Sequence, residues 1–401
     1  MSELAGPKWS DELPAGADVV VVGAGIVGAA IAARLARAGA EVCLLERSGP
    51  AAGSSSSGEG NLLVSDKLPG PELDLALRSL VLWQEVDAEA AERIELERKG
   101  GLVVAWDEAQ LAALQALAAA QEAAGVAIRH LGGTELVDAE PHLSGEVAGA
   151  VFYEADSQVQ PMYAVAHLLA QAAANGCRMM RGTEVCGWRT TPRGSQALET
   201  TLGSLRVGTA VVNAAGSWAG ELAARLGSDL PVAPRRGHVL VTEPMPVVTA
   251  HKVYEADYVG SIHDQDDGWR CSSVVEATAS GTMLLGSSRE LVGWSAVPDP
   301  QIVASIAARA IRLFRGLAAA KLLRTYVGFR PATPDRLPAI GWDARVPGLL
   351  HATGHEGAGI GLSLATAEAV QCLLCKTVPP VGLQPFDPAR FSKTTETRPE
   401  P

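Results

Sequence analysis

Six residues near the start of the chain have the spacing of a phosphate-binding turn. The run Gly23-Ala24-Gly25-Ile26-Val27-Gly28 lies between a β-branched stretch, Asp18 to Val22, and a stretch rich in Ala, Leu and Arg, Ile26 to Ala38. In this context Gly23 permits a tight turn, Gly25 lets the backbone approach a pyrophosphate, and Gly28 lets helix and strand pack closely. The helix N-terminus offers free N–H groups to the phosphates. The pattern predicts a dinucleotide site; a purely structural glycine turn is the alternative.

A carboxylate ends the strand that is expected to follow this helix. Glu46 closes the stretch Glu41 to Glu46 and lies 18 positions beyond Gly28. At that place a carboxylate can accept hydrogen bonds from both hydroxyls of a ribose, and it disfavours a 2′-phosphate. Strand, turn, helix and strand within about 30 residues predict one right-handed βαβ unit.

The serine and glycine stretch Ser54 to Leu62 comes soon after this carboxylate. Such a composition suits a flexible linker. Its position instead favours contact with a long ligand, because hydroxyls and backbone amides so close to the ribose carboxylate can follow that ligand toward a flavin. We therefore expect FAD rather than a nicotinamide dinucleotide, whose enzymes continue through further βα units.

The composition restricts the class of protein. The 401 residues suffice for two or three domains, and 47% hydrophobic against 19% charged residues excludes global disorder. A net charge of -12 repels phosphate backbones, so no nucleic-acid partner is expected. Six scattered cysteines lack the spacing of a disulfide framework or an iron–sulfur cradle, which predicts a reducing, cytoplasmic setting. The longest apolar stretch, Val19 to Ala33, is too short for a transmembrane segment, so none is expected.

The remaining pattern predicts an α/β fold in which a discontinuous Rossmann-like FAD-binding domain carries an inserted α+β substrate domain. After Gly227, strand-like segments alternate with glycine turns, which predicts a largely antiparallel sheet for the substrate domain. Helices are expected over Pro71 to Glu92 and Ile360 to Lys376. The polar ends, 1–16 and 387–401, are expected to fray. The expected FAD-binding domain comprises residues 17–105, 150–230 and 325–385, and the substrate domain residues 106–149 and 231–324.

Four further motifs follow the first one along the chain: Ser54 to Leu62, Val211 to Ala219, Gly328 to Pro331, and Gly354 to Gly361. With them, nearly the whole chain resembles the D-amino-acid oxidase, glycine oxidase and sarcosine oxidase superfamily of FAD amine oxidoreductases. Within this superfamily, Arg235 to Glu243 and Leu285 to Glu290 look most like the catalytic B subunits of opine oxidases, D-hydroxyproline dehydrogenase and the hydrogen cyanide synthase flavoprotein.

The resemblance implies which residues hold FAD. The part nearer the flavin ring would contact Gly60, Asn61 and Leu62, and Gly216 lies in the matched middle motif. A helix starting near Gly359 would aim its N-terminal amides at the flavin N1/C2 edge, where charge gathers on reduction. The adenosine and pyrophosphate side would contact Gly23, Gly25, Ile26, Val27, Gly28, Glu46, Arg47, Ser55, Ser56 and, through its backbone, Val185. The loop that meets the flavin matches His355, Glu356, Gly357, Ala358, Gly359, Ile360 and Gly361.

Arg330 is the residue that the resemblance places against the substrate carboxylate. It follows an apolar strand whose pairing Pro331 is expected to end. A guanidinium fork suits bidentate binding of a carboxylate in a dry site. An interdomain salt bridge is the alternative role for this arginine.

The chain departs from its relatives at two places. Several relatives tether the flavin through His or Cys, but the segments after the serine run and around Arg330 contain neither, so non-covalent FAD is expected. Glycine oxidases carry an active-site tyrosine where an approximate alignment places serine here. Tyr254 and Tyr258 lie nearby in sequence and are the candidates to substitute for it. No metal is expected: His263 to Asp267 is interpreted as a solvated acidic loop, and His351 and His355 are not expected to share a helical face.

The combined hypothesis is a FAD-dependent amino-acid dehydrogenase or oxidase acting on CH–NH or CH–NH2 groups. Arg330 would hold the carboxylate of a D-amino acid, imino acid, glycine or opine while a hydride passes from Cα to flavin N5 and leaves an imine. Two alternatives stay open: a self-sufficient oxidase that produces peroxide from oxygen, and a non-catalytic FAD-binding subunit. The closer resemblance implies two partners, a second flavoprotein subunit and an iron–sulfur subunit.

Overall fold

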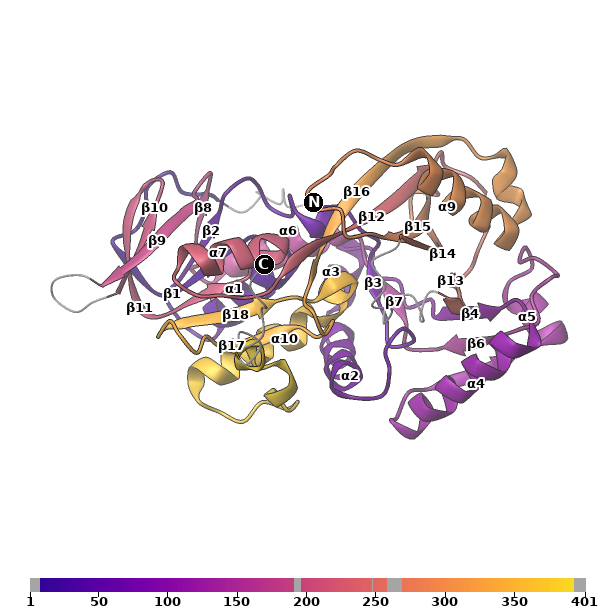
Figure 1. The fold of residues 1–401 in the computed structure, drawn as a ribbon, viewed down its shortest axis with the longest axis horizontal. Coiled ribbons are helices and arrows are strands. Elements are labelled where there is room, and N and C mark those ends of the chain that lie inside the picture. The colour runs from indigo at the N-terminus through magenta and orange to yellow at the C-terminus, as the bar shows by residue number, and fades with distance from the viewer. Residues whose placement is uncertain (1–7, 191–195, 247, 258–268, 393–401) are drawn as a thin grey trace, which may run out of the picture. The chain divides into compact units, whose positions relative to one another are not determined.

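The computed structural model describes residues 8–190, 196–246, 248–257 and 269–392. The chain forms two compact units, and each is built from separate stretches of sequence (Figure 1). The first unit contains Met1–Ser56, Pro161–Pro234 and Arg330–Pro401, and the second contains Ser57–Gln160 and Arg235–Phe329.

The first unit is built on the βαβ element that the sequence predicts. Strand β1 (Gly16–Val22) pairs in parallel with β2 (Val42–Glu46) and with β11 (Gly203–Asn213). Val20 and Val21 are fully buried, which explains the continuous β-branched run. The main path of the sheet has the order β17-β18-β11-β1-β2-β8, and β9 and β10 extend from β11. Its other strands are β8 (Arg178–Arg181), β9 (Val185–Thr190), β10 (Gln196–Thr200), β17 (Ala339–Trp342) and β18 (Leu349–Thr353).

Helices of the first unit pack beside helix α1 (Ile26–Arg37). Most of α1 is buried, as its apolar sequence favours. One neighbour is α10 (Gly359–Cys375), to which Arg34 of α1 is tied by an ion pair with Glu368 at 2.8 Å. In the described part of the chain, Glu356–Cys375 is long and apolar enough to cross a membrane, yet 56% of that window is buried inside the protein. We therefore interpret α10 as a core helix. The remaining helices are α6 (Pro161–Ala174) and α7 (Ala219–Arg225).

Among its described residues, the second unit contains an eight-stranded sheet of order β16-β12-β15-β14-β13-β4-β6-β5. The pairs β14 with β15, β13 with β14, and β4 with β6 are antiparallel, and β13 with β4 is parallel. A separate ribbon joins β3 to β7. The strands are β3 (Asn61–Leu62), β4 (Gly101–Ala105), β5 (Ile128–Leu131), β6 (Gly149–Tyr153), β7 (Ser157–Gln158), β12 (Ala233–Thr242), β13 (Lys252–Glu255), β14 (Arg270–Ala277), β15 (Met283–Arg289) and β16 (Leu322–Ala332).

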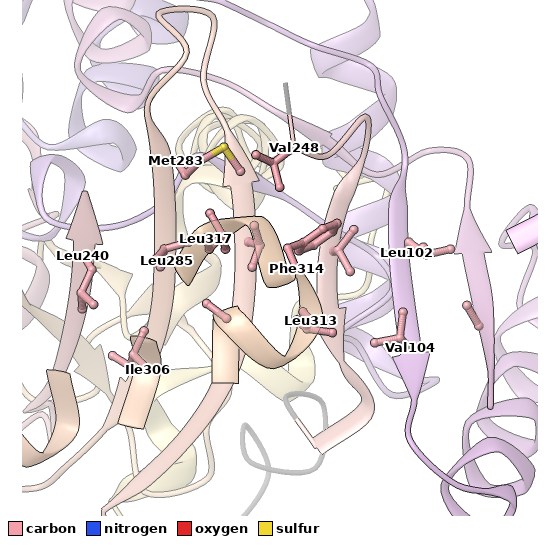
Figure 2. Packing of buried hydrophobic residues seen from close by; sticks show 14 of the residues in the cluster. Leu102, Val104, Leu240, Val248, Met283, Leu285, Ile306, Leu313, Phe314 and Leu317 are labelled. Carbon is pink, nitrogen blue, oxygen red and sulfur yellow. The ribbon is translucent and has the colours of Figure 1, made fainter. Parts of the chain in front are cut away.

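One face of this sheet is covered by α9 (Pro300–Leu313) and the short helix η3 (Arg315–Ala319) that follows it. Figure 2 shows Ile306, Phe314 and Leu317 from this segment against Leu240 and Leu285 of the strands, and all five side chains are buried. Burying each such side chain contributes about 1.5–3 kcal/mol, so this contact fixes the helix on the sheet. The other helices are α2 (Pro71–Gln84), α3 (Ala88–Arg93), α4 (Glu108–Ala123) and α5 (Gly133–Ala139).

The α/β fold is confirmed, and local differences from the sequence predictions have physical reasons. The single helix expected over Pro71 to Glu92 is two helices, because Asp87 accepts a hydrogen bond from the Ala90 amide at 2.9 Å and starts α3. Strand β16 continues through Pro331, which an edge strand tolerates. Helix α10 begins near the predicted position.

The limits of the compact units differ from the predicted domain limits. Residues 57–105 and 150–160 lie in the second unit, since β4 and β6 belong to its sheet. Residues expected to fray make defined contacts: the Ser10 amide donates to the Met179 carbonyl at 2.8 Å, and Pro388–Phe391 forms a helical turn. Residues 1–7 and 393–401 lie outside the described ranges.

Candidate functional site

The glycine turn of the first unit has room for glycine only. Gly23 has a φ of +110°, and a Cβ at this position would lie 2.5 Å from the carbonyl oxygen of Ala214. A Cβ at Gly28 would lie 1.9 Å from the carbonyl oxygen of Gly23. The turn and the first part of α1 therefore pack too closely for any side chain at either position, as a dinucleotide-binding turn requires.

Glu46 and the serine run both lie against this turn. The Glu46 carboxylate accepts hydrogen bonds from the amides of Ala24 at 2.8 Å and Ser48 at 2.7 Å, which hold it at the end of β2. Ser55 accepts from the Ile26 amide at 3.0 Å, so its hydroxyl stands at the N-terminus of α1. Ser54–Ser56 forms a short helix rather than a flexible linker. The glycine turn Gly23–Gly28, Glu46 and the serine run thus lie together and form what we call the corner of the first unit.

A tryptophan that the sequence analysis did not single out lies beside this corner. The guanidinium of Arg47 lies 5.3 Å from the centre of the Trp218 ring, and a Cβ at Gly53 would lie 3.0 Å from that ring. Arg225 donates to the Val185 carbonyl at 3.3 Å, so the predicted adenine contact on β9 is held close to α7. The clue in the sequence was the position of Trp218, two residues beyond Gly216.

The loop before α10 contains a buried histidine and brings a glycine close to the predicted substrate arginine. His355 is buried and bonded to the Thr366 hydroxyl at 2.9 Å; burial lowers its pKa to about 4. A Cβ at Gly357 would lie 3.5 Å from Arg330 Nε, so the arginine side chain packs over this glycine. The cap residue of α10 makes no side-chain hydrogen bond to its first turn. The arrangement can present both amide donors and a guanidinium to an anion.

The second histidine of the pair has a different environment. His351 lies on β18, where it bonds to Asp343 at 2.8 Å and faces the Asn213 amide at 3.3 Å. The hydrogen bonds that Asp343 accepts from His351 and Ser228 hold the pKa of that carboxyl below its usual range, although burial opposes them. Within the described ranges, no three His, Cys, Asp or Glu side chains form a group suited to a metal.

The predicted flavin-ring contacts Gly60, Asn61 and Leu62 belong to the second unit. A Cβ at Gly60 would lie 1.7 Å from the Val159 carbonyl oxygen, so this backbone is tightly packed. Leu62 is fully buried, and Asn61 donates to the Glu59 carboxylate at 3.3 Å. Glu59 was not among the predicted site residues; its only signal was a charge within a serine and glycine stretch.

Tyr254, considered as a substitute for the active-site tyrosine, belongs to a buried cluster of the second unit. Its hydroxyl donates to Asp156 at 2.8 Å and also contacts Ser65. Asp156 accepts from the Val64 amide at 2.8 Å as well, and burial raises its pKa to about 6. Tyr258 and the His263 to Asp267 loop lie outside the described residues.

The parallel strands at the centre of this mixed sheet, the glycine turn and the carboxylate at the end of β2 together define a dinucleotide-binding oxidoreductase fold of the flavoprotein type. The chain belongs to the FAD dependent oxidoreductase family, abbreviated DAO, which matches residues 18–373. The resemblance seen in the sequence is thereby confirmed, and FAD is the cofactor of this family.

Relatives and solved structures agree with this assignment. The chain is 30% identical to hydrogen cyanide synthase subunit HcnC of Pseudomonas aeruginosa over 81% of this chain and 75% of that protein. It is 30% identical to glycine oxidase of Geobacillus kaustophilus, over 93% and 97% of the two chains. The crystal structure of glycine oxidase from that organism superposes with a TM-score of 0.84 and 28% identity, and covers 94% of this chain and 99% of that one.

The residues of the first unit fit an adenine dinucleotide. The glycine turn leaves a cradle that a Cβ would fill, and Ser55 lies 3.2 Å from the place where a Gly25 Cβ would stand. Glu46 is fixed by two backbone amides and, being a carboxylate, keeps further lone pairs for ribose hydroxyls. The roles of individual residues toward FAD remain predictions.

Proposed function

We propose that this protein oxidises the Cα–N bond of an amino acid or an N-substituted amino acid. The single bond becomes a C=N double bond with loss of two electrons and two protons, and water then hydrolyses the imine. Bound FAD would supply the acceptor for the two electrons. Arg330 binds the substrate carboxylate and thereby orients Cα. The amine reacts in its neutral form, and we assign no general base.

One observation supports this proposal above the others: the Arg330 side chain packs over Gly357. Gly357 belongs to the loop that, by resemblance, meets the flavin. The Arg330 guanidinium, which can bind a carboxylate, therefore lies beside the expected position of the reacting ring. Hydrogen bonds to charged groups contribute about 1.5–3 kcal/mol each, and a bidentate pair makes two of them. Glycine oxidase is similar over nearly the whole chain, which supports an amino-acid substrate.

Replacing the guanidinium tests the proposal. Arg330→Leu is expected to keep bound FAD while kcat/KM for carboxylate substrates falls about 100-fold or more, since both charge-assisted bonds are lost. Arg330→Lys keeps the charge but not the fork, so a smaller loss is expected. Arg345→Leu is the control, because Arg345 is exposed and pairs with Asp229 at 3.7 Å. Unchanged kcat/KM in Arg330→Leu would refute the assigned role.

The electron acceptor separates two versions of this proposal. Similarity to HcnC, which is named as a subunit, supports a dehydrogenase that passes electrons to partner subunits. The resemblance seen in the sequence implies that one partner carries a second flavin and another an iron–sulfur cluster. Similarity to glycine oxidase supports direct use of oxygen. After anaerobic reduction, rapid reoxidation of the isolated chain on mixing with oxygen indicates an oxidase, and slow reoxidation indicates a dehydrogenase. FAD that no amino acid ever bleaches would instead indicate a non-catalytic subunit.

We also propose that FAD is held without a covalent bond. Ser54–Ser56 offers hydroxyls at the corner of the first unit, and His355 is already engaged with Thr366 in a buried position. Precipitation of the protein with acid should release all the yellow colour into the supernatant. Colour that stays with the pellet would contradict non-covalent binding.

A further inference from the structure

A ribbon of the second unit buries two amide side chains whose oxygens have no donor. Asn61 of β3 and Gln158 of β7 stand directly opposite each other, and they are 9% and 4% exposed. Side chains of directly opposed residues lie on the same face of a ribbon. In the part of the chain that the structure describes, neither Asn61 Oδ1 nor Gln158 Oε1 has a hydrogen-bond partner. Leaving a buried acceptor unpaired costs about 1–3 kcal/mol, so a ligand that donates hydrogen bonds would be favoured here.

The side-chain nitrogen of each amide fixes the orientation of the group. Asn61 Nδ2 donates to Glu59 Oε2 at 3.3 Å, where the carboxyl oxygen accepts. Gln158 Nε2 donates to the Ala277 carbonyl at 2.9 Å, which can only accept. The amide nitrogens therefore face the protein, and the two oxygens are left as acceptors.

Glu59 adds a carboxylate to the same region. It is 8% exposed, and a Cβ at Gly286 would lie 2.0 Å from Glu59 Oε1, so glycine at that position makes room for the carboxylate. The nearby Tyr326 hydroxyl donates to the Gly58 carbonyl at 3.4 Å. Burial, and then the negative charges of Glu59 and Glu276, raise the pKa of Tyr326. The surroundings are thus rich in hydrogen-bond acceptors.

We propose that Glu59, Asn61 and Gln158, the acceptor cluster, select amino-acid substrates whose substituent ends in an N–H or O–H donor. The inference rests on the proposed function, because it is the resemblance that puts Gly60, Asn61 and Leu62 near the flavin ring. A hydroxyl, amine or guanidinium on the substituent satisfies the two amide oxygens. An apolar substituent of the same size leaves them unpaired, and it is discriminated against for that reason.

Matched substrate pairs test the proposal by anaerobic reduction of the flavin. Two pairs are used, serine with alanine and ornithine with norvaline, and both enantiomers of each are tested. The members of a pair differ mainly in one terminal hydrogen-bond donor. The wild-type protein is expected to favour the donor-bearing member of a reactive pair about tenfold, the equivalent of one net hydrogen bond. In Asn61→Leu and Gln158→Met this ratio, measured per bound FAD, is expected to fall to within about twofold of unity.

An exposed amide provides the matched control. Asn175→Leu removes a side chain that donates to the Gln171 carbonyl at 2.8 Å at the end of α6, and the preference should persist. A wild-type protein that prefers the apolar members, or a preference unchanged in both cluster variants, would overturn the proposal.

A binding measurement separates this proposal from the proposed function. The unreactive pair 3-hydroxypropionate and propionate is titrated into the oxidised holoenzyme, and each Kd is read from the change in flavin absorbance. The hydroxylated ligand should bind about tenfold more tightly to the wild-type protein and no more tightly to Asn61→Leu. If amino acids fail to bleach the flavin but this ratio holds, only the proposed reaction is wrong. If bleaching occurs and the ratio is absent, only the acceptor cluster is wrong.

Discussion

The two units form their polar regions by different means. The corner of the first unit is made from backbone: glycines allow close approach, and amides of Ala24, Ile26 and Ser48 are held by Glu46 and Ser55. The second unit buries charged side chains on its sheet, including the ion pair of Lys252 with Glu276. A backbone site depends on space, whereas a buried side-chain site depends on charge and protonation. Mutations and pH should therefore affect the two units differently.

The largest effect is expected from filling the space at the glycine turn. Gly28→Ala puts a Cβ 1.9 Å from the Gly23 carbonyl oxygen, and this backbone atom cannot move aside as the end of a flexible side chain could. We expect FAD retained after purification, measured as flavin absorbance per protein, to fall at least about tenfold, with loss of the pyrophosphate contact. Gly49→Ala is the matched control, because nothing lies within 4 Å of its Cβ position. Full FAD content in Gly28→Ala would contradict the backbone interpretation.

Acid should weaken the first unit through His355. Burial lowers its pKa from 6.5 to about 4, so the unfolded chain binds more protons than the native one between these values. The stabilising effect of keeping the ring neutral is present above pH 6.5 and is lost as the pH falls toward 4. It amounts to about 3 kcal/mol. The free energy of unfolding, measured with urea between pH 4 and 7, should fall less with acid in His355→Gln than in the wild-type protein. The same dependence on pH in both proteins would rule out this histidine as the cause.

The Asp156 cluster should respond to pH with the opposite sign. Burial raises the pKa of Asp156 from 3.8 to about 6, so the native state binds the extra proton. The stabilisation that this proton contributes is fully present below pH 3.8 and is lost as the pH rises through 6. Over that range the free energy of unfolding falls by about 2–3 kcal/mol. Asp156→Asn should remove this dependence in urea titrations and keep an acceptor for the Val64 amide. A variant as pH-dependent as the wild-type protein would show that another group is responsible.

The smallest effect is expected where a glycine and a side chain meet, at Gly357 and Arg330. A Cβ there would lie 3.5 Å from Arg330 Nε, which is ordinary contact, so Gly357→Ala should change kcat/KM less than about twofold. Gly357→Val adds branches that displace the guanidinium, and KM should rise about tenfold while kcat changes less. Equal kinetics for the two variants would show that the packing of Arg330 on this glycine does not position it.

The sequence allowed the first unit to be predicted more fully than the second. Turn, helix and strand around Gly23 to Glu46 are adjacent in the chain, so their spacing alone revealed the corner, and the start of α10 was apparent from Gly359. Glu59 meets Gly286, and Asp156 meets Tyr254, from distant segments, and no spacing rule links either pair. Burial of a charged side chain such as Lys252 depends on its partner Glu276, which a strand pattern does not reveal. Trp218 lies in a motif that the sequence revealed, but its contact with Arg47 could not be predicted, because the two residues are far apart in the chain.

The division of the chain into interleaved stretches has a consequence for biosynthesis. Strand β11 pairs with β1 on one side and with β18 on the other, and β18 follows β11 only after the whole second stretch of the other unit. The sheet that holds the glycine turn is therefore incomplete until β18 has been synthesised. Such distant pairings make folding slow, because the intervening loop must close first. Flavin would then be loaded only after β18 has been made, and truncation of the chain before β18 should abolish loading even though every residue of the turn is present.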